Sequence, residues 1–385
     1  MARRTRGEGS VTFKKKLKLW AAKVPIDEFD AKGKRKFVYA YGKTAEEASR
    51  KRAELQQKVT DNILTEPHRM TVADLMAAYL EHKQARVKPR THELYEIDAK
   101  RFINPKLGGV LISKLMPLQI ERMQSEIHRK TGARAAKSAR DTLSRALRQG
   151  VRWRLLTYNP ADGVDPIKPQ SATMEVWEPE EVRHFLEVAR TSPLFALFYL
   201  ALTTGMRRGE LLALRWKDVL LTGPNPSIMV RNTVSLVRSK VTLGDPKTGK
   251  GVRRLALFGD QVDVIQAHQA ALELERSGLG DAWQDHDLVF PSEVGTVISP
   301  GNLAQRHWYP LRKESQCKLI RFHDLRHTYA SLAIRAGMDI RLLADRLGHR
   351  DPSFTLRVYA HVFEQYRQSG AMPLEKLLAE PVQRV

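Results

Sequence analysis

The stretch "LGHRDPSFTLRVYAH" at residues 347–361 places one tyrosine, two histidines and two arginines among apolar residues. A single tyrosine most often packs on one face of an amphipathic helix, so Tyr359 is structural unless other groups indicate chemistry. A phenol ionises near pH 10, and on the order of one in a thousand is phenolate at neutral pH. A nucleophilic tyrosine therefore needs cationic neighbours or a base.

The stretch "HDLRH" (323–327) offers both kinds of group. His323 and Arg326 are three residues apart, which places them on one face of a helix. A histidine moves protons and an arginine holds an oxyanion bidentately, so the pair suits a phosphate. A zinc site at His323 and His327 is the weaker interpretation, because an aspartate replaces the glutamate of the zinc motif H-E-x-x-H.

A second arginine follows a sharp turn. "TTGMRRGELLALRW" (203–216) continues an apolar run, residues 194–205, that predicts a buried helix ending at Gly205. A glycine turn on such a rigid element can present the guanidinium of Arg207 inward, as an anion ligand. A purely structural pairing of Arg207 with Glu210, three residues further on, stays open.

Lysines occupy a third stretch, "GDPKTGKG" (244–251), which nearly matches the phosphate-binding loop of ATPases. Gly251 stands where that loop needs a hydroxyl, and the following "VRRLALF" alternates like a strand instead of opening a helix. We therefore reject the ATPase interpretation. As a hairpin turn, the stretch would carry Lys247 and Lys250 at its tip.

Together these stretches resemble the sequence boxes of the tyrosine recombinases, over residues 175–365, and the layout before them resembles the phage-integrase branch. The resemblance implies two arginines that grip the scissile phosphate, a hairpin lysine that protonates the leaving 5′ oxygen, a proton-transfer histidine, a phosphate-binding histidine and a nucleophile. The two arginines would be Arg207 and Arg326, and the lysine would be Lys247, with Lys250 as its substitute. The proton-transfer histidine would be His323, the phosphate-binding histidine would be His349, and the nucleophile would be Tyr359. Glu210 would brace the site. The resemblance implies no cofactor and no metal.

The charge of the chain indicates the partner. Its 65 Lys and Arg exceed its 43 Asp and Glu, a net charge of +22. Such a surplus points to a polyanion, and double-stranded DNA is preferred over an anionic membrane surface. No apolar stretch approaches the ~18 residues that span a bilayer. The lone Cys317 argues against a disulfide framework, so we expect a cytoplasmic protein, associated with the nucleoid of a bacterial host.

The first 60 residues carry 17 Lys and Arg against 7 Asp and Glu. Apolar and polar residues alternate over 11–24 and 36–42, which predicts strands, with Phe13 and Leu17 on the core face. Thr44 and Glu47 form the capping box of a following helix. The opposite strand face predicts DNA contacts by Lys14, Lys16, Lys18 and Trp20, although an ordinary charged sheet is the alternative.

Helical patterns fill the next segment. Thr71, Thr91 and Pro117 are predicted helix starts, and residues 133–156 form a long helix that is basic on nearly every turn. Its basic side chains are predicted to follow a phosphate backbone, and the DNA-binding candidates are Arg134, Lys137 and Arg140.

The predicted fold is a multidomain α+β chain. Residues 1–64 form a three-stranded sheet plus helix that binds arm-type DNA. Residues 69–165 form an all-α, SAM-like core-binding domain of four helices. Residues 175–385 form a mixed, mainly α catalytic domain of the tyrosine recombinase type.

The function implied by the resemblance is site-specific recombination, which integrates or excises a phage or other mobile element through a 3′-phosphotyrosine intermediate. The implied partners are core-type and arm-type DNA sites, a homotetramer on DNA and DNA-bending accessory proteins, with no membrane. Two alternatives stay open: relaxation of DNA in the manner of a type IB topoisomerase, and a non-catalytic DNA-binding regulator.

Overall fold

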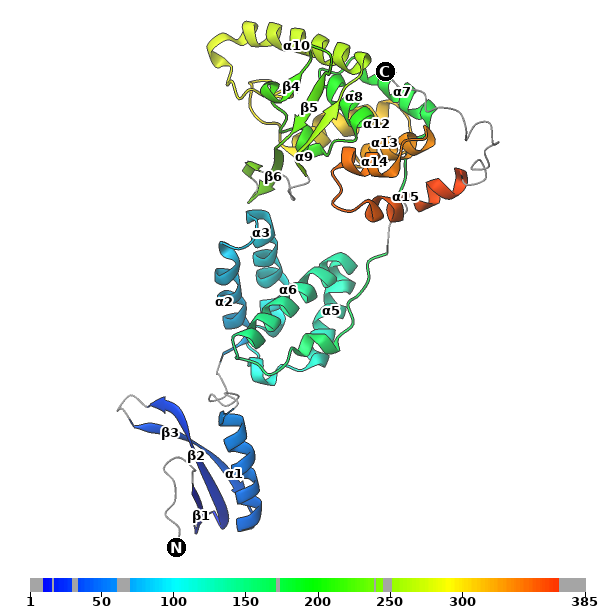
Figure 1. Ribbon diagram of the computed structural model, residues 1–385. Helices are drawn as coiled ribbons and strands as arrows, with labels where there is room; N and C mark the ends of the chain where they lie inside the picture. Colours follow the sequence, from blue (N-terminus) through cyan, green and yellow to red (C-terminus); the bar gives the residue numbers. More distant parts are fainter. Residues whose placement is uncertain are drawn as a thin grey trace. The chain divides into compact units, whose positions relative to one another are not determined.

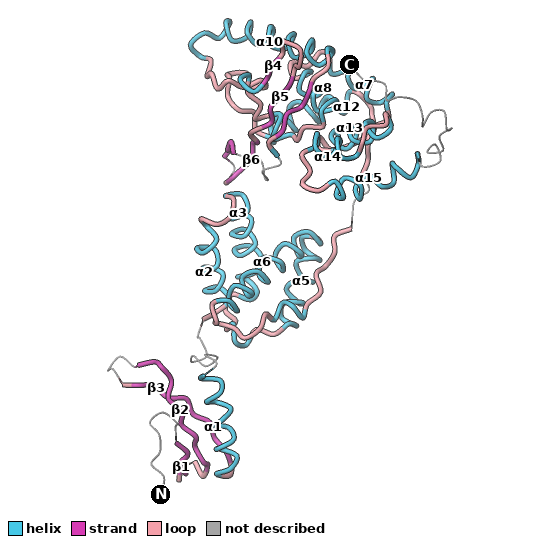
Figure 2. Tube along the Cα trace, in the orientation of Figure 1, coloured by secondary structure: helices cyan, strands magenta, loops and turns pink. Residues whose placement is uncertain are grey.

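The computed structural model describes residues 10–15, 17–29, 34–60, 70–170, 174–238, 240–244 and 251–366 (Figures 1 and 2). The chain divides into two compact units, Met1–Ser171 and Ala172–Val385, which are described separately. No helix in the described segments is long and apolar enough to cross a membrane.

The first unit begins with an antiparallel sheet of order β1-β2-β3, followed by α1 (Figure 2). The elements are β1 (Ser10–Lys14), β2 (Leu19–Phe29), β3 (Arg35–Gly42) and α1 (Ala45–Thr60). Strand β3 confirms the pattern over 36–42, but the single strand predicted over 11–24 is wrong. The chain instead turns near Lys18, whose φ is 50°, and Phe13 comes to lie opposite Trp20.

The core of this sheet also differs from the expectation. Phe13 and Leu17 are 47% and 57% exposed, whereas Ala21, Ala22 and Val24 are buried. The turn between β1 and β2 breaks the continuous alternation on which the prediction relied, and α1 packs on β2 and β3. The Thr44 cap is confirmed, because Glu47 N donates to Thr44 Oγ1 (3.1 Å), but the Glu47 carboxylate accepts from Lys43 N (2.8 Å) and not from Thr44 N as a capping box requires.

The remainder of the first unit is helical. Its elements are α2 (Val72–Gln84), α3 (Pro89–Ile97), the π-helix η1 (Asp98–Ile103), α4 (Asn104–Leu107), η2 (Ile112–Lys114), α5 (Pro117–Thr131), α6 (Ala133–Arg152) and η3 (Pro160–Gly163). Thr71 caps α2 and Pro117 opens α5, as predicted. The start predicted at Thr91 is wrong, because Pro89 takes the first turn of α3, where its missing amide costs nothing.

The second unit combines helices with two small antiparallel sheets, of order β4-β5-β8 and β6-β7. Its helices are α7 (Pro179–Ala189), α8 (Phe195–Thr204), α9 (Arg208–Leu211), η4 (Trp216–Asp218), α10 (Gly259–Leu279), η6 (Gly280–Ala282), α11 (Pro300–Asn302), η7 (Leu303–Trp308), α12 (Tyr309–Glu314), α13 (Asp324–Arg335), α14 (Ile340–Leu347) and α15 (Pro352–Tyr366). Its strands are β4 (Val219–Leu220), β5 (Ser227–Val230), β6 (Thr233–Val237), β7 (Lys240–Gly244) and β8 (Arg253–Ala256).

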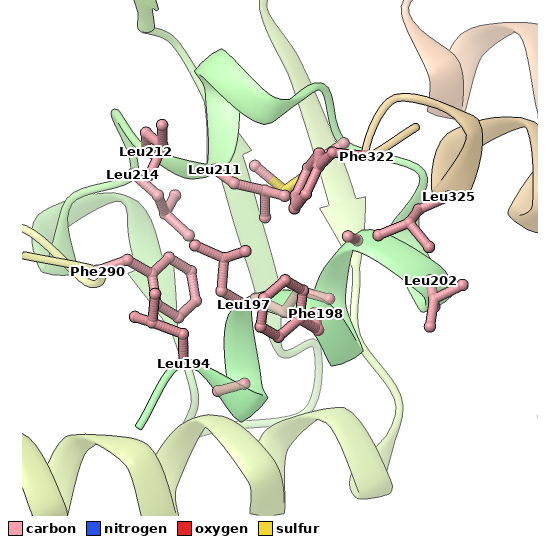
Figure 3. Close-up of a cluster of buried hydrophobic side chains, with 14 of the residues drawn as sticks. Leu194, Leu197, Phe198, Leu202, Leu211, Leu212, Leu214, Phe290, Phe322 and Leu325 are labelled. Atoms are coloured by element: carbon pink, nitrogen blue, oxygen red, sulfur yellow. The ribbon is translucent and has the colours of Figure 1, made fainter. Parts of the chain in front are cut away.

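Helix α8 forms the centre of the main core of this unit. It is apolar on every side, as expected for a buried helix, and it packs against α7, α10 and α13. Figure 3 shows Leu197 and Phe198 at the centre of this cluster, with Phe290 and Phe322 nearby. A second, smaller cluster joins α13, α14 and α15 and includes Tyr359. The two clusters meet along α13, which therefore has a fixed place in the fold.

Gly205 ends α8 in the left-handed conformation, with φ of 65°. A Cβ atom at this position would overlap Cδ1 of Tyr329 and lie 2.8 Å from Cδ2 of Leu347. Glycine is therefore required twice, for its backbone conformation and for the close approach of α13 and α14.

We predict that Gly205→Ala lowers the free energy of unfolding by about 3 kcal/mol, because strain and overpacking add. Gly223→Ala is the matched control: Gly223 also has a positive φ (87°), but nothing lies within 4 Å of its Cβ position. The control should lose about 1 kcal/mol. Chemical denaturation of the full chain measures both, and equal losses would refute the steric contribution.

Candidate active site

Arg207 leaves the Gly205 turn and caps α9. Its backbone amide and its Nη1 donate to Glu210, over 2.9 and 2.7 Å, so the pairing with Glu210 does form. Nη2 reaches the carbonyl oxygen of Gly348 at 3.3 Å. The arginine side chain nevertheless keeps about a third of its surface exposed. Pairing with Glu210 therefore orients a guanidinium that remains accessible to an anion.

Glu210 also binds Arg253 of β8, which sequence reasoning missed. Arg253 Nη2 lies 2.9 Å from Glu210 Oε2, and its Nη1 lies 3.3 Å from Oε1. The carboxylate is 3% exposed. Burial opposes ionisation, but the hydrogen bond and charge of Arg253, together with the charge of Arg207, hold the pKa of Glu210 below its ordinary value. The ionised carboxylate is thus shared by two arginines from different elements.

Arg326, on α13, is 3% exposed and is held by the ends of two helices. Its Nη1 donates to the carbonyl oxygen of Gly205 at 2.7 Å, and its Nη2 donates to that of Leu347. Both carbonyls lie at helix C-termini, where the helix dipole favours a cation. Burial, together with the charge of Arg207, lowers the pKa of Arg326 to about 9, so the guanidinium still carries its charge at neutral pH.

His349 is fixed by two hydrogen bonds. Its Nε2 lies 2.9 Å from Nη2 of Arg326, and its Nδ1 lies 2.7 Å from Oγ1 of buried Thr355. A guanidinium only donates, so Nε2 accepts and the ring proton is assigned to Nδ1. Burial and the charges of Arg326 and Arg207 lower the pKa of His349 to about 3. The ring is neutral here.

Tyr359, on α15, is 1% exposed, and its hydroxyl lies 2.7 Å from Nδ1 of His327. Burial raises the pKa of this phenol above its ordinary value, although the charge of Arg326 opposes the shift. The ring of His323 packs edge-on against the ring of His327, with centroids 5.3 Å apart. Burial, with the nearby His327 and Arg326, lowers the pKa of His323 to about 4, although the residue keeps exposed surface.

Five of the six predicted catalytic residues thus lie in one unit, on segments that contact one another. Arg326 contacts His349 directly, and His327 links His323 to Tyr359. Lys247 and Lys250 lie outside the described residues. Two residues that contact the candidate site were not predicted: Arg253 looked like part of an ordinary strand, and His327 was considered only as a zinc ligand. Their partners lie 43 and 32 residues away, so no local pattern connected them.

The predicted DNA-binding residues differ from one another in their exposure and in their contacts. Lys14 and Lys18 are exposed, Trp20 is half-buried against Phe13, and Lys16 lies outside the described residues. Arg134 is exposed on α6, and Lys137 pairs with Asp141. Arg140 is used differently, because its Nη2 donates to the carbonyl oxygens of Ala161 (2.8 Å) and Val164 (2.7 Å). The guanidinium of Arg140 therefore holds the turn at the end of this unit.

Comparison with known proteins identifies the class. Residues 175–366 match the phage integrase family, and residues 71–128 match the N-terminal SAM-like domain of phage integrases. The chain is 28% identical over 381 residues to an integrase of Streptomyces ambofaciens, with 97% of each chain covered. It is 26% identical to a XerC-like tyrosine recombinase of Caldanaerobacter subterraneus, with 88% of this chain and 91% of the relative covered.

Solved structures show the same fold. The integrase of transposon Tn1549, in complex with transposon right-end DNA, superimposes with a TM-score of 0.66 at 20% identity, covering 80% of this chain and 100% of that chain. A lambda integrase tetramer bound to a Holliday junction gives a TM-score of 0.56 at 18% identity, covering 92% and 96%. The protein is a tyrosine-type site-specific DNA recombinase. It belongs to the phage integrase family.

We predict that Glu210→Gln lowers the free energy of unfolding by about 3 kcal/mol at neutral pH, since Arg253 loses the charge that compensates its own. The folded-state pKa of Glu210 is depressed, so its contribution is complete above the ordinary carboxyl pKa and is lost as the pH falls from that value through the lower folded-state pKa. The difference between wild type and variant should therefore shrink below about pH 4.

Denaturation curves across this pH range measure that difference. Glu314→Gln, on the exposed end of α12, is the control and should stay close to wild type. If the difference between wild type and Glu210→Gln stays constant from about pH 7 to about pH 3, an ionised, arginine-bound Glu210 is contradicted.

Proposed function

We propose that the protein cleaves and rejoins DNA at specific sites with Tyr359 as nucleophile, integrating or excising a phage or other mobile element. The phenol oxygen attacks a phosphate, a 5′-hydroxyl leaves, and a 3′-phosphotyrosine links protein to DNA. The observation that carries the proposal is the convergence of Arg207, Arg326, His349 and Tyr359 within one unit. That unit is also the part of the chain that matches the phage integrase family.

The two arginines would stabilise the charge that develops on the nonbridging oxygens during in-line attack. Arg207 is accessible and braced by Glu210, which suits it to receive the phosphate first. Arg326 is preorganised by two helix-terminal carbonyls, so no side-chain ordering accompanies the reaction. To donate to the phosphate as well, His349 would move its proton from Nδ1 to Nε2.

The buried position of Tyr359 has a consequence for the reaction. A phenol that is 1% exposed cannot contact a phosphate until the segments that cover it move. We propose that DNA binding drives this movement and that the uncomplexed protein holds its nucleophile protonated, which protects DNA from cleavage outside an assembled complex. The phosphotyrosine ester conserves the energy of the broken bond, so rejoining needs neither ATP nor metal.

The leaving 5′ oxygen needs a proton, and we assign its donor to Lys247, in the segment between β7 and β8. Lys250 is the alternative in the same segment. His323 would assist proton transfer; it lies at the start of α13, one turn before His327.

DNA is the partner, and the enzyme acts as a multimer. We propose that it works as a tetramer on two duplexes, because recombination exchanges four strands. The basic residues 1–64 would bind arm-type sites, with Lys14, Lys16, Lys18 and Trp20 as the candidate contacts. Residues 69–165 would bind core sites through α6, and residues 175–385 would catalyse. DNA-bending proteins would bridge the two kinds of site on the bacterial nucleoid.

The two rival functions are less well supported. A type IB topoisomerase would relax supercoils without paired sites, and a regulator would bind DNA without the catalytic set. The family matches over both the SAM-like and the catalytic segments favour recombination over either rival.

We predict that Tyr359→Phe abolishes the covalent protein–DNA complex on a nicked core-site suicide substrate while leaving DNA binding unchanged, because only the attacking oxygen is removed. Tyr329→Phe is the matched control: it removes another buried phenol of the same cluster, one that accepts from Arg346 at 2.9 Å. This control should still form the complex. A covalent adduct formed by the Tyr359→Phe protein would refute the assignment.

We further predict that Lys247→Ala slows cleavage about 100-fold or more on an ordinary substrate, since the 5′ oxygen then leaves unprotonated. A substrate with sulfur at the bridging 5′ position should restore the rate, because a thiol ionises near pH 8.5 and leaves without an acid. Lys250→Ala is the control and should cleave both substrates at nearly the wild-type rate. The reverse pattern would move the role to Lys250.

A further inference from the structure

We infer that His327 is the base of this reaction: it takes the proton of Tyr359 during cleavage and returns it during rejoining. The inference rests on the proposed function and deepens it, because family resemblance had assigned proton transfer to His323. The sequence indicated His327 only as a candidate zinc ligand. His327 contacts the attacking oxygen itself, so it would act on the reaction directly and not through another residue.

The distance carries the inference. Nδ1 of His327 lies 2.7 Å from the Tyr359 hydroxyl, within the range over which a general base accepts a proton. The rings are 5.8 Å apart and tilted by 53°, which directs a ring nitrogen at the oxygen instead of stacking the faces. Within the described segments no hydrogen bond or ring contact joins His323 to Tyr359; His323 instead packs edge-on against His327.

The surroundings of His327 keep its ring neutral, and one neighbouring carboxylate, Asp324, favours the protonated form. Burial lowers the pKa of His327, the charges of Arg326 and Arg321 lower it further, and the carboxylate of Asp324 raises it. The ring is therefore neutral at neutral pH and can accept a proton. Asp324 lies one helical turn before His327 on α13, and Arg321 holds it through two hydrogen bonds, of 2.9 and 2.7 Å. Its fixed negative charge stabilises the imidazolium once that forms.

The step balances without any added reagent. The phenol oxygen of Tyr359 forms a bond to phosphorus as its O–H bond breaks, and the proton passes to Nδ1 of His327. The bond from phosphorus to the 5′ oxygen breaks, and that oxygen takes a proton from the proposed acid, Lys247. Rejoining runs in reverse: the 5′-hydroxyl attacks phosphorus and returns its proton to that acid, the bond from phosphorus to the phenol oxygen breaks, and the phenol oxygen takes back the proton from His327.

A competing explanation is that His327 merely positions the tyrosine. Asparagine separates the two roles, because its amide oxygen can occupy the place of Nδ1 and accept a hydrogen bond from the phenol, but it cannot take the proton. His327→Ala removes both functions and leaves space for free imidazole. His307→Asn is the matched control, since His307 is another half-buried histidine of the same unit, and burial likewise lowers its pKa.

The experiment measures single-turnover formation of the covalent complex by full-length protein on the suicide substrate, with either oxygen or sulfur at the bridging 5′ position. Melting curves and DNA binding are recorded for each variant. We expect His327→Asn to be slowed about 100-fold or more on both substrates, since a sulfur leaving group replaces the acid and not the base. Imidazole should accelerate His327→Ala at least tenfold, leave His307→Asn unchanged, and give a pH profile that follows the ionisation of the added imidazole.

Three results would overturn the inference. The first is a His327→Asn protein that reacts within about threefold of wild type, which makes the role positional. The second is rescue of His327→Asn by the sulfur substrate, which makes His327 an acid. The third is a His327→Ala protein that imidazole does not accelerate. Each requires a wild-type protein that does form the tyrosine adduct. Absence of that adduct in wild type would instead reject the proposed function as a whole.

Discussion

The catalytic unit depends on the buried guanidinium of Arg326. A charge that is 3% exposed persists only if its surroundings compensate it, and here the carbonyl oxygens at the ends of α8 and α14 do so. Those carbonyls are available because Gly205 and Gly348 end both helices in the left-handed conformation. One side chain therefore ties three helices together at the point where we propose that a phosphate is held. The position of His349 follows from the same guanidinium.

Two further arginines, Arg207 and Arg253, keep the rest of the site in shape because they share one carboxylate. Glu210 connects α9, through Arg207, to β8, through Arg253. Arg253 in turn donates to the carbonyl oxygen of Arg346 on α14 and lies against Gly348. The sheet and the helices are thus joined by one shared carboxylate. Its negative charge also offsets part of the repulsion among Arg207, Arg253 and Arg326.

The structure holds Tyr359 and the nearby histidines in a state in which the tyrosine cannot attack a phosphate. Tyr359 is protonated and buried, and the rings of His323, His327 and His349 are kept neutral by burial and by nearby cations. Neutral histidines can accept protons, and a buried phenol cannot reach DNA. The same burial therefore leaves the proposed base able to accept a proton and withholds the proposed nucleophile, so the proposed reaction requires a change that exposes the hydroxyl.

The amino-acid sequence by itself determined local features, because spacing along single helices and turns is local: His323 and Arg326 within one turn of α13, Thr71 as a cap, and Gly205 as a helix end. It failed over residues 11–24, where a turn at Lys18 reversed the predicted faces, since alternation cannot reveal a break in a strand. Only the tertiary structure decided that Glu210 serves Arg253, that Arg140 holds a turn and that Tyr359 meets His327. Those partners are far apart in the chain, and folding brings them together by burying apolar surface elsewhere.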